Sequence, residues 1–370
     1  MRTELASLDF VFLVPELKER LLGGIVQKVW QQDKELRLEI FVSGKGSHEL
    51  YFAPGKLFIT EFKRTAPEQP GAFAMVLRKH LSGQKIADVR QHGFDRIVEL
   101  ETADYVLVFE LFARGNVILC DKNLQIIMPL EQHTFKDRSI RPKRQYVYPP
   151  AVSNPLIMEL EELRGLFKHS KKEVVKFLAA DLSLSGLYAE ELLLRAGVDK
   201  SKPADELTGE ETAELHEQLA QLAAVKQPQL VSEGGNLLDV TSFPLKLYGQ
   251  KESRQLTTLT SALDEFFTHG QVTMAEAGKV AGVEADKAKL EHRLAEQNAA
   301  VEKWQRIDQD SRKNARLIEG NMELVERVLA SIERARKSGV EWSEIKARAA
   351  EEEPAIKEIR EKDGKVILEL

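Results

Sequence analysis

Apolar and polar residues alternate most regularly between residues 93 and 130. The apolar runs cover residues 97–100, 106–112 and 117–119, and short polar joints separate them. A period of two residues is typical of strands that bury one face, and Gly115-Asn116 suits a tight turn because both residues tolerate positive φ. The pattern therefore predicts successive antiparallel strands.

The first 150 residues contain further elements that point to a mixed α+β domain. Ser7 is expected to cap a helix with the apolar face Leu8, Phe12, Leu17 and Leu21, while Asp9 lies on its opposite face. Pro15 is expected to kink this helix or to move its start. Strands are predicted at 25–31, 35–41, 49–52 and 57–60, and a helix at 72–81. Tyr148-Pro149-Pro150 is expected to close the domain as a stiff linker.

The remainder of the chain is predominantly helical in pattern. Helices are predicted at 172–180, 187–196 and 210–222, and a helical run from 284 to 337 has apolar residues at spacings of three and four, typical of a coiled coil. A short helix at 342–350 and a strand at 365–370 follow. The expected domains are therefore 1–150, 151–270 with a short β segment, 271–340 as a coiled-coil arm, and 341–370 as the start of a small domain.

Composition excludes several classes of protein. The 370 residues are 43% hydrophobic and 30% charged, with no run of eighteen apolar residues to cross a membrane and no secretory signal. Cys120 is the only cysteine, which excludes internal disulfides and a Cys-based zinc site and fits the cytoplasm. The eight histidines share no ligand spacing, and no phosphate loop or dinucleotide fingerprint occurs. We therefore predict no metal, no cofactor and no catalytic residues.

Positive charge is unevenly distributed along the chain. The net charge is −6, but residues 1–150 hold 22 Lys and Arg against 19 Asp and Glu. The surplus gathers between His133 and Tyr148, in the side chains Lys136, Arg138, Arg141, Lys143 and Arg144. The aromatic residues Phe135, Tyr146 and Tyr148 are interleaved with them. Cations among aromatics suit phosphates and unstacked bases. A solvated loop with a few core aromatics is an equally open interpretation.

Polar side chains also mark the ends of the predicted strands. Asp95-Arg96 precedes one strand, and Arg114 and Asn116 lie at the turn before another. Such groups can reach a partner while the sheet fixes their position. Ordinary turn solvation, or an ion pair at the strand start, is the alternative.

The helical segment carries a more specific resemblance. Residues 186–216 are similar to the helix–two-turn–helix of formamidopyrimidine-DNA glycosylases, in which a tight turn aims backbone N–H groups at a phosphate. That chemistry is missing, because the chain begins Met1-Arg2-Thr3-Glu4 without the N-terminal proline nucleophile and lacks the cysteines of a zinc finger. Ser183 and Ser185 replace the two glycines of the hairpin.

The order and spacing of several segments resemble the NFACT family, which has this scaffold without the glycosylase chemistry. The matching segments are 8–24 with Asp9, 73–83, 93–100 with Asp95-Arg96, LFARGNVILCD, the glycosylase-like helices, 243–245, 262–267, EHRLAEQNAAVEKW and ARLIEGNMELVERVL. The resemblance implies an α+β fold with a glycosylase-like N-terminal β-rich domain, a helix–hairpin–helix-type helical domain and a coiled-coil arm. Family members continue into the returning helix of the arm and a further RNA-binding domain, so the sequence is expected to be truncated.

The resemblance also implies a function in ribosome-associated quality control. Such proteins bind the large ribosomal subunit that carries a stalled peptidyl-tRNA, and recruit tRNA, chiefly tRNA-Ala, for template-free tailing of the nascent chain. The family's tailing residues map onto Asp95 and Arg96, and its N-terminal acidic residue onto Asp9. With Arg114 and Asn116, these form the expected tRNA-binding set, in a protein that positions tRNA and is not itself an enzyme.

Two other functions stay open at this point. One is a DNA-binding or repair protein on the glycosylase-like scaffold, which predicts base excision or a preference for damaged duplex. The other is a surface adhesin, since some bacterial relatives are described as fibronectin-binding, although no export signal occurs.

Overall fold

The computed structural model describes residues 2–112, 114–135 and 137–369, and all their side chains except those of residues 269–286, 288, 350 and 352. The chain divides into two compact units, Met1–Ala275 and Glu276–Leu370, which are described separately below. No helix in the described residues is both long enough and apolar enough to span a membrane.

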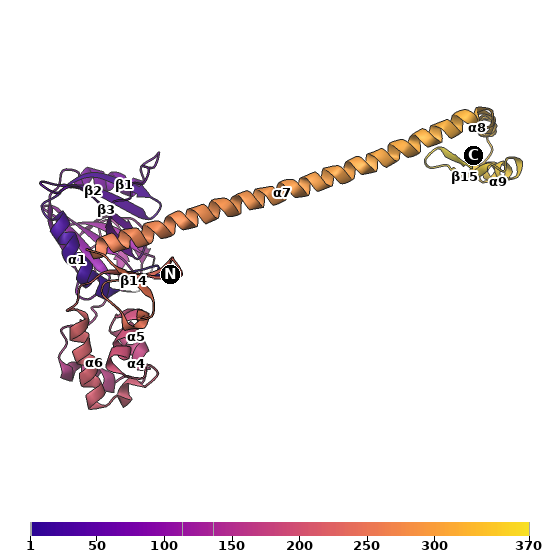
Figure 1. The fold of residues 1–370 in the computed structure, drawn as a ribbon. Helices are drawn as coiled ribbons and strands as arrows, with labels where there is room; N and C mark the ends of the chain where they lie inside the picture. Colours follow the sequence, from indigo (N-terminus) through magenta and orange to yellow (C-terminus); the bar gives the residue numbers. More distant parts are fainter. Residues whose placement is uncertain (1, 113, 136, 370) are drawn as a thin grey trace. The chain divides into compact units, whose positions relative to one another are not determined.

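Two antiparallel sheets form the N-terminal part of the first unit (Figure 1). The four-stranded sheet contains β1 (Ile25–Gln32), β2 (Glu35–Val42), β3 (Gly46–Ala53) and β4 (Lys56–Thr60). The five-stranded sheet contains β5 (Ile86–Gln91), β6 (Ile97–Thr102), β7 (Tyr105–Glu110), β8 (Asn116–Asp121) and β9 (Ile126–Pro129). Helix α2 (Ala72–Leu81) connects them. The antiparallel strands predicted from the alternation between residues 93 and 130 are confirmed.

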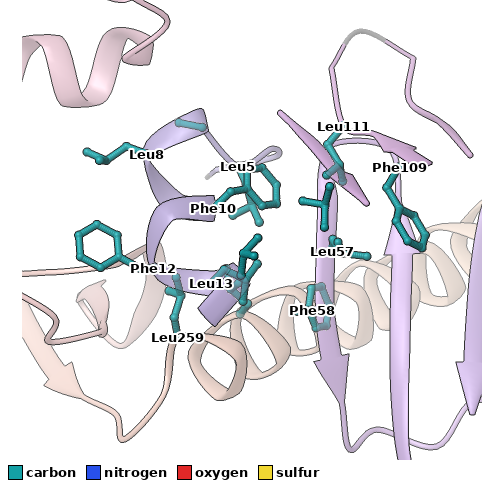
Figure 2. Close-up of a cluster of buried hydrophobic side chains, with 14 of the residues drawn as sticks. Leu5, Leu8, Phe10, Phe12, Leu13, Leu57, Phe58, Phe109, Leu111 and Leu259 are labelled. Carbon is teal, nitrogen blue, oxygen red and sulfur yellow. The ribbon is translucent and has the colours of Figure 1, made fainter. Parts of the chain in front are cut away.

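Helix α1 (Ser7–Leu21) is buried on almost every side, not along one face. Figure 2 shows Leu5, Phe10 and Leu13 directed toward the strand that carries Leu57 and Phe58, with Leu8 and Phe12 on the other side of the helix. The buried residues include the charged Asp9 and Glu16, whereas Pro15, Lys18 and Glu19 are exposed. The predicted helix is confirmed; it begins at Ser7 itself and continues through Pro15 to Leu21.

The predicted cap of α1 is corrected by the structure. Ala6, not Ser7, occupies the N-cap position, and its backbone N–H donates to the Asp9 carboxylate at 2.7 Å. The Asp9 carboxylate in the first helical turn therefore supplies the reciprocal hydrogen bond of a capping box, back to the N-cap N–H.

The segment between residues 133 and 148 covers the outer face of the five-stranded sheet. It contains the short strands β10 (His133–Thr134) and β11 (Ser139–Ile140). Ile140 and Tyr146 pack in a second small core with strand residues such as Val108 and Ile118. This sheet is thus buried on both faces.

A helical segment and a small sheet complete the first unit. The helices are α3 (Leu160–Lys168), α4 (Val174–Lys176), the π-helix η1 (Phe177–Asp181), α5 (Ser185–Ala196), the short 3₁₀-helix η2 (Ala204–Glu206) and α6 (Gly209–Leu222). Figure 1 shows α4, α5 and α6 grouped together, apart from β1, β2 and β3. The short 3₁₀-helix η3 (Lys246–Tyr248) follows the second strand of the three-stranded sheet, whose strands are β12 (Gln229–Glu233), β13 (Asn236–Thr241) and β14 (Glu252–Gln255).

One hydrophobic core extends from Leu5 to Phe267, so the boundary expected near residue 150 does not divide it. Helix α7 (Leu259–Gly320) begins inside this core, where Leu259, Leu263 and Phe266 are buried, and not at residue 271 as expected. The buried Glu16 carboxylate accepts hydrogen bonds from the backbone N–H groups of Leu259 and Thr260 at 3.0 Å each. The first turn of α7 is thereby fixed to α1.

The second unit holds the C-terminal elements. These are α8 (Met322–Lys337), α9 (Trp342–Glu352), β15 (Ile356–Arg360) and β16 (Lys365–Leu368). Val328 and Ile332 of α8 pack against Ile345 and Ile359. The helix and strand predicted after residue 341 are therefore present, and α8 shares their core instead of belonging to the preceding arm.

Candidate functional site

A cleft of about 760 Å³ in the first unit brings together four segments that are distant in sequence. Its lining comes from the N-terminal residues, the loop before β6, the turn before α5, and the β13–η3 region: Arg2, Thr3, Glu4, Leu5, Ala6, Ser7, Asp95, Arg96, Ala179, Ala180, Ser183, Ser185, Gly186, Leu187, Leu238, Asp239 and Tyr248. Asp95 and Arg96 stand out in the sequence as a charged pair before a strand, and Ser183 and Ser185 stand where a hairpin would have glycines. The tertiary structure places them in one site.

Arg2 anchors the N-terminal segment to the wall of the cleft. Its guanidinium pairs with the Asp9 carboxylate, donates to the Val240 carbonyl oxygen at 2.9 Å, and lies 5.8 Å from the centroid of the Tyr188 ring. Burial is the largest single effect and lowers the pKa of the Arg2 guanidinium, but Asp9, Tyr188 and Asp239 together outweigh it and raise the pKa of Arg2 above its ordinary value. Arg2 therefore stays positively charged, and the carboxylate of Asp9 balances that charge.

Asp9 lies beneath the cleft, with its side chain 1% exposed. Besides Arg2 and the Ala6 N–H, its carboxylate accepts hydrogen bonds from the Tyr188 hydroxyl and, at 2.9 Å, from the Ser242 hydroxyl. These four donors occupy the hydrogen-bond acceptor positions of the Asp9 carboxylate. Asp9 thus positions the wall of the cleft, and its expected contact with tRNA stays a prediction.

Asp95 and Arg96 lie immediately before β6, as the sequence predicted, and both are half-buried. The Asp95 carboxylate accepts from the Arg96 backbone N–H at 2.7 Å. The Gln91 side chain donates to the carbonyl oxygens of Asp95 at 2.9 Å and of Ser7 at 3.0 Å, which ties this loop to α1. The Arg96 guanidinium reaches into the cleft and pairs with Glu4 at 3.0 Å.

The turn before α5 forms the opposing part of the lining. Ser183 and Ser185 have φ of +53° and +69°, the left-handed conformation for which glycine is usually required. Both serines thus adopt the left-handed backbone conformation of the glycines that they replace in the resemblance, and the hairpin itself stays a prediction. The first turn of α5 leaves backbone N–H groups without helical acceptors, and no side chain caps it.

Asp239 and Tyr248 close the remaining side of the cleft. The Tyr248 hydroxyl donates to the Asp239 carboxylate at 2.7 Å, and the Val240 backbone N–H donates to its other oxygen at 2.7 Å. Burial raises the pKa of Asp239 even though Arg2 and Tyr248 oppose the shift.

Arg114 and Asn116 do not line this cleft. Arg114 is exposed at the turn before β8. Asn116 is 2% exposed, and its amide exchanges two hydrogen bonds with the Glu131 backbone, at 2.9 and 3.0 Å. In this geometry Asn116 fixes the chain after β9, and its expected role in tRNA binding stays a prediction.

The basic segment is divided between the interior and the surface. Arg138 points inward, with its side chain 9% exposed and 2.5 Å from Glu110, which also accepts from the Tyr146 hydroxyl at 2.9 Å. Arg138 therefore stabilises the cover of the sheet instead of belonging to a free basic surface.

The other members of the segment differ in position. Arg141, Lys143 and Arg144 are exposed, as a nucleic-acid-binding patch requires. Lys136 lies outside the described residues. Tyr148, one of the interleaved aromatics, donates to the buried Glu99 at 2.6 Å and stacks on His92 at 3.6 Å between ring centroids. Both tyrosine hydroxyls of the segment thus serve the fold.

Several residues of the site carry no signal in the sequence that marks them as functional. Arg2, Glu4, Gln91 and Asp239 carry no periodicity or motif that marks them, because each acts through a partner distant in sequence. A charged residue shortly before the start of a largely buried helix was the only local signal for Arg2.

Comparison with known proteins matches residues 7–360 to a family model described as NFACT N-terminal and middle domains. The chain is 31% identical over 396 residues to the archaeal Rqc2 homolog aRqcH of Methanocaldococcus jannaschii, covering 100% of this chain and 58% of that protein. It is 24% identical over 400 residues to the human ribosome quality control complex subunit NEMF, covering 98% of this chain and 37% of that protein. The chain therefore spans only part of the length of these relatives.

Solved structures support the fold over about 70% of the chain. The fibrinogen binding protein from Staphylococcus aureus superposes with a TM-score of 0.59 at 22% identity, over 71% of this chain and 98% of that chain. The N-terminal part of the fibronectin/fibrinogen-binding protein from Streptococcus suis gives a TM-score of 0.59 at 23% identity, over 72% of this chain and 100% of that chain.

Proposed function

Because the chain belongs to the NFACT family, we propose that it acts in ribosome-associated quality control in the cytoplasm. It binds the large ribosomal subunit that carries a stalled peptidyl-tRNA, and it recruits tRNA, chiefly tRNA-Ala, for template-free tailing of the nascent chain. The names of the archaeal and human relatives support a role in this process.

The observation that carries the tRNA-binding part of this proposal is the convergence on one cleft. Arg96, the N-terminal residues held by Asp9, and the left-handed turn at Ser183 and Ser185 line the same cavity. A guanidinium can grip phosphate bidentately or stack on a base, and the first turn of a helix offers N–H donors to an anion. Both kinds of group suit a folded RNA.

In this proposal the protein positions its substrates and carries out no chemistry of its own. Peptide-bond formation belongs to the ribosome, so the cleft needs no nucleophile and no general base. What it needs is a fixed geometry, and the contacts of Gln91 with Ser7 and Asp95 supply it by holding the Arg96 loop against α1.

The exposed Arg141, Lys143 and Arg144 extend the proposed interface. Their charges are suited to phosphate contacts that add affinity without reading sequence. Arg138 is left out of this surface because its guanidinium is buried against Glu110.

The test is to identify the RNAs that copurify with the chain. Wild type is compared with Asp95→Ala/Arg96→Ala and with a control, Arg254→Ala/Glu265→Ala, which removes an exposed ion pair outside the cleft. We expect one or two tRNA species to be enriched with wild type and with the control, and to be lost with the cleft variant.

Equal tRNA recovery from all three proteins would contradict the placement of the site in this cleft. Enrichment of no tRNA, together with excision of a base from damaged duplex DNA, would favour the alternative of a repair protein on the same scaffold. Because the chain spans 58% of its archaeal relative, the comparison is repeated with a longer chain.

A further inference from the structure

The charges that line the cleft are unusual for a nucleic-acid site. Its ionisable carboxyl and guanidinium groups are those of Arg2, Glu4, Asp95, Arg96 and Asp239, and the described lining contains no lysine. Arg2 is already neutralised by Asp9. Arg96 is therefore the one cation that the described lining offers to a ligand, and acidic side chains surround it.

Glu4 is the acidic residue that engages Arg96 directly, at 3.0 Å. Its backbone is fixed, because the Arg2 guanidinium donates to the Glu4 carbonyl oxygen at 2.9 Å and the next residue, Leu5, donates to the Gly55 carbonyl oxygen at 2.9 Å. Its side chain is 54% exposed, and that of Arg96 is 27% exposed. The carboxylate can therefore leave Arg96 while the chain that carries it stays in place.

We propose that Glu4 is a selectivity residue of the cleft, which favours ligand groups that both donate and accept hydrogen bonds over bare phosphate. This inference rests on the proposed function and adds to it which part of an RNA the cleft accepts. A nucleobase edge or a ribose hydroxyl accepts from Arg96 and donates to Glu4 at the same time. A phosphate has only acceptor oxygens, so it must displace Glu4 and remain close to its negative charge.

This arrangement excludes generic polyanions from a site that holds an arginine. An isolated guanidinium binds any phosphate, whereas a guanidinium paired with a carboxylate requires a ligand that satisfies both partners. Specificity built from such repulsion costs some affinity, and Asp95 beside Arg96 acts in the same direction.

The experiment measures binding of tRNA and of inorganic polyphosphate, a polyanion without hydrogen-bond donors at neutral pH. The proteins are wild type, Glu4→Gln, Arg96→Ala and the double variant. Glu210→Gln is the matched control, since it removes the same charge from an exposed position on α6 outside the cleft. Thermal melting verifies that each variant is folded.

We expect Glu4→Gln to tighten polyphosphate binding by about two- to five-fold and to weaken tRNA binding by about two- to five-fold. The gain in polyphosphate binding should disappear in Glu4→Gln/Arg96→Ala, and Glu210→Gln should change neither ligand. A Glu4→Gln protein that binds both ligands more tightly, or neither differently, overturns the proposal.

Failure of the proposed function gives a different result. In that case wild type binds tRNA no better than polyphosphate, and the claim that the cleft accepts an RNA edge falls with it. A gain in polyphosphate binding that still depends on Arg96 would then support the exclusion of phosphate by Glu4 alone.

Discussion

The hydroxyl of Tyr188 donates a hydrogen bond to the carboxylate of Asp9, which lies 179 positions earlier in the chain. The bond joins the first helix of the fold, α1, to α5 of the helical segment. The hydroxyl of Ser242 donates to the same carboxylate at 2.9 Å. One buried aspartate therefore fixes three distant segments around the cleft.

Replacing Asp9 with alanine should destabilise the first unit strongly. The variant leaves the guanidinium of Arg2 buried without its counter-ion, and breaking a buried pair in this way costs about 3–5 kcal/mol. Urea unfolding measures the loss. Asp95→Ala serves as the comparison, because this half-buried carboxylate bonds to its neighbour's backbone and should cost only about 1 kcal/mol. Equal stability of Asp9→Ala and wild type would contradict the role of Asp9 as a support.

Arg138 and Arg141 should behave differently although they lie three residues apart in one basic segment. Arg138→Ala breaks the buried pair with Glu110 and should lower the free energy of unfolding by about 3 kcal/mol. Arg141→Ala removes an exposed charge and should change stability by less than about 0.5 kcal/mol.

RNA binding provides the second measurement for this pair. Arg141→Ala should reduce the slope of log affinity against log salt by about one. If Arg138→Ala were fully stable and reduced the salt slope instead, the division of the segment into interior and surface would be wrong.

Gly55 and Gly44 allow backbone strain to be separated from a steric clash. Both have positive φ, of +73° and +77°. A Cβ at Gly55 would lie 2.6 Å from the Glu4 Cβ, whereas a Cβ at Gly44 meets nothing within 4 Å. Gly44→Ala should cost about 1 kcal/mol for the strain alone, and Gly55→Ala about 1–3 kcal/mol more. Thermal melting of the two variants tests this, and equal shifts would show that the Glu4 segment can move away.

The acid stability of the first unit should depend on Glu101 of β6. A hydrogen bond from Lys122 lowers the pKa of this carboxyl below its ordinary value of 4.5; partial burial opposes the shift, and Arg90 reinforces it. A lowered native pKa contributes stability that is present above pH 4.5 and is lost as the pH falls through the native pKa.

Glu101→Gln should therefore be less stable than wild type at neutral pH and should lose less stability on acidification. Urea unfolding at about pH 7 and about pH 3.5 measures both quantities. Glu210→Gln, on the exposed surface of α6, should leave the pH dependence unchanged. An unaltered acid slope in Glu101→Gln would mean that the pairs with Lys122 and Arg90 contribute nothing to stability.

The periodic spacing of apolar residues determined those helices and strands in which buried and exposed positions alternate regularly. Helix α2 was predicted at 72–81 and is found there, and the strands between 93 and 130 follow their alternation. Strand β14 was not predicted individually, because all four of its residues are exposed and it has no buried face to create an alternation.

Whether a given residue is buried, and which partner it contacts, could be determined only from the tertiary structure. The sequence indicated one apolar face on α1, but the helix is buried on nearly all sides. The rings of Phe12 and Phe243, for example, lie 5.6 Å apart between their centroids. Arg138 resembles Arg141 in sequence, and only the position of Glu110 beneath it decides that it turns inward.

The candidate site divides in the same way. From the sequence alone came the family resemblance, the Asp95-Arg96 pair before a strand, and the hairpin serines. The tertiary structure decided that these residues line one cleft, that the buried Asp9 holds the N-terminal wall of the cleft in place, and that Glu4 forms an ion pair with Arg96. The physical reason is range: strand and helix periodicity arises from neighbours a few residues apart, whereas charge pairing and burial depend on partners that only the folded chain brings within about 3 Å.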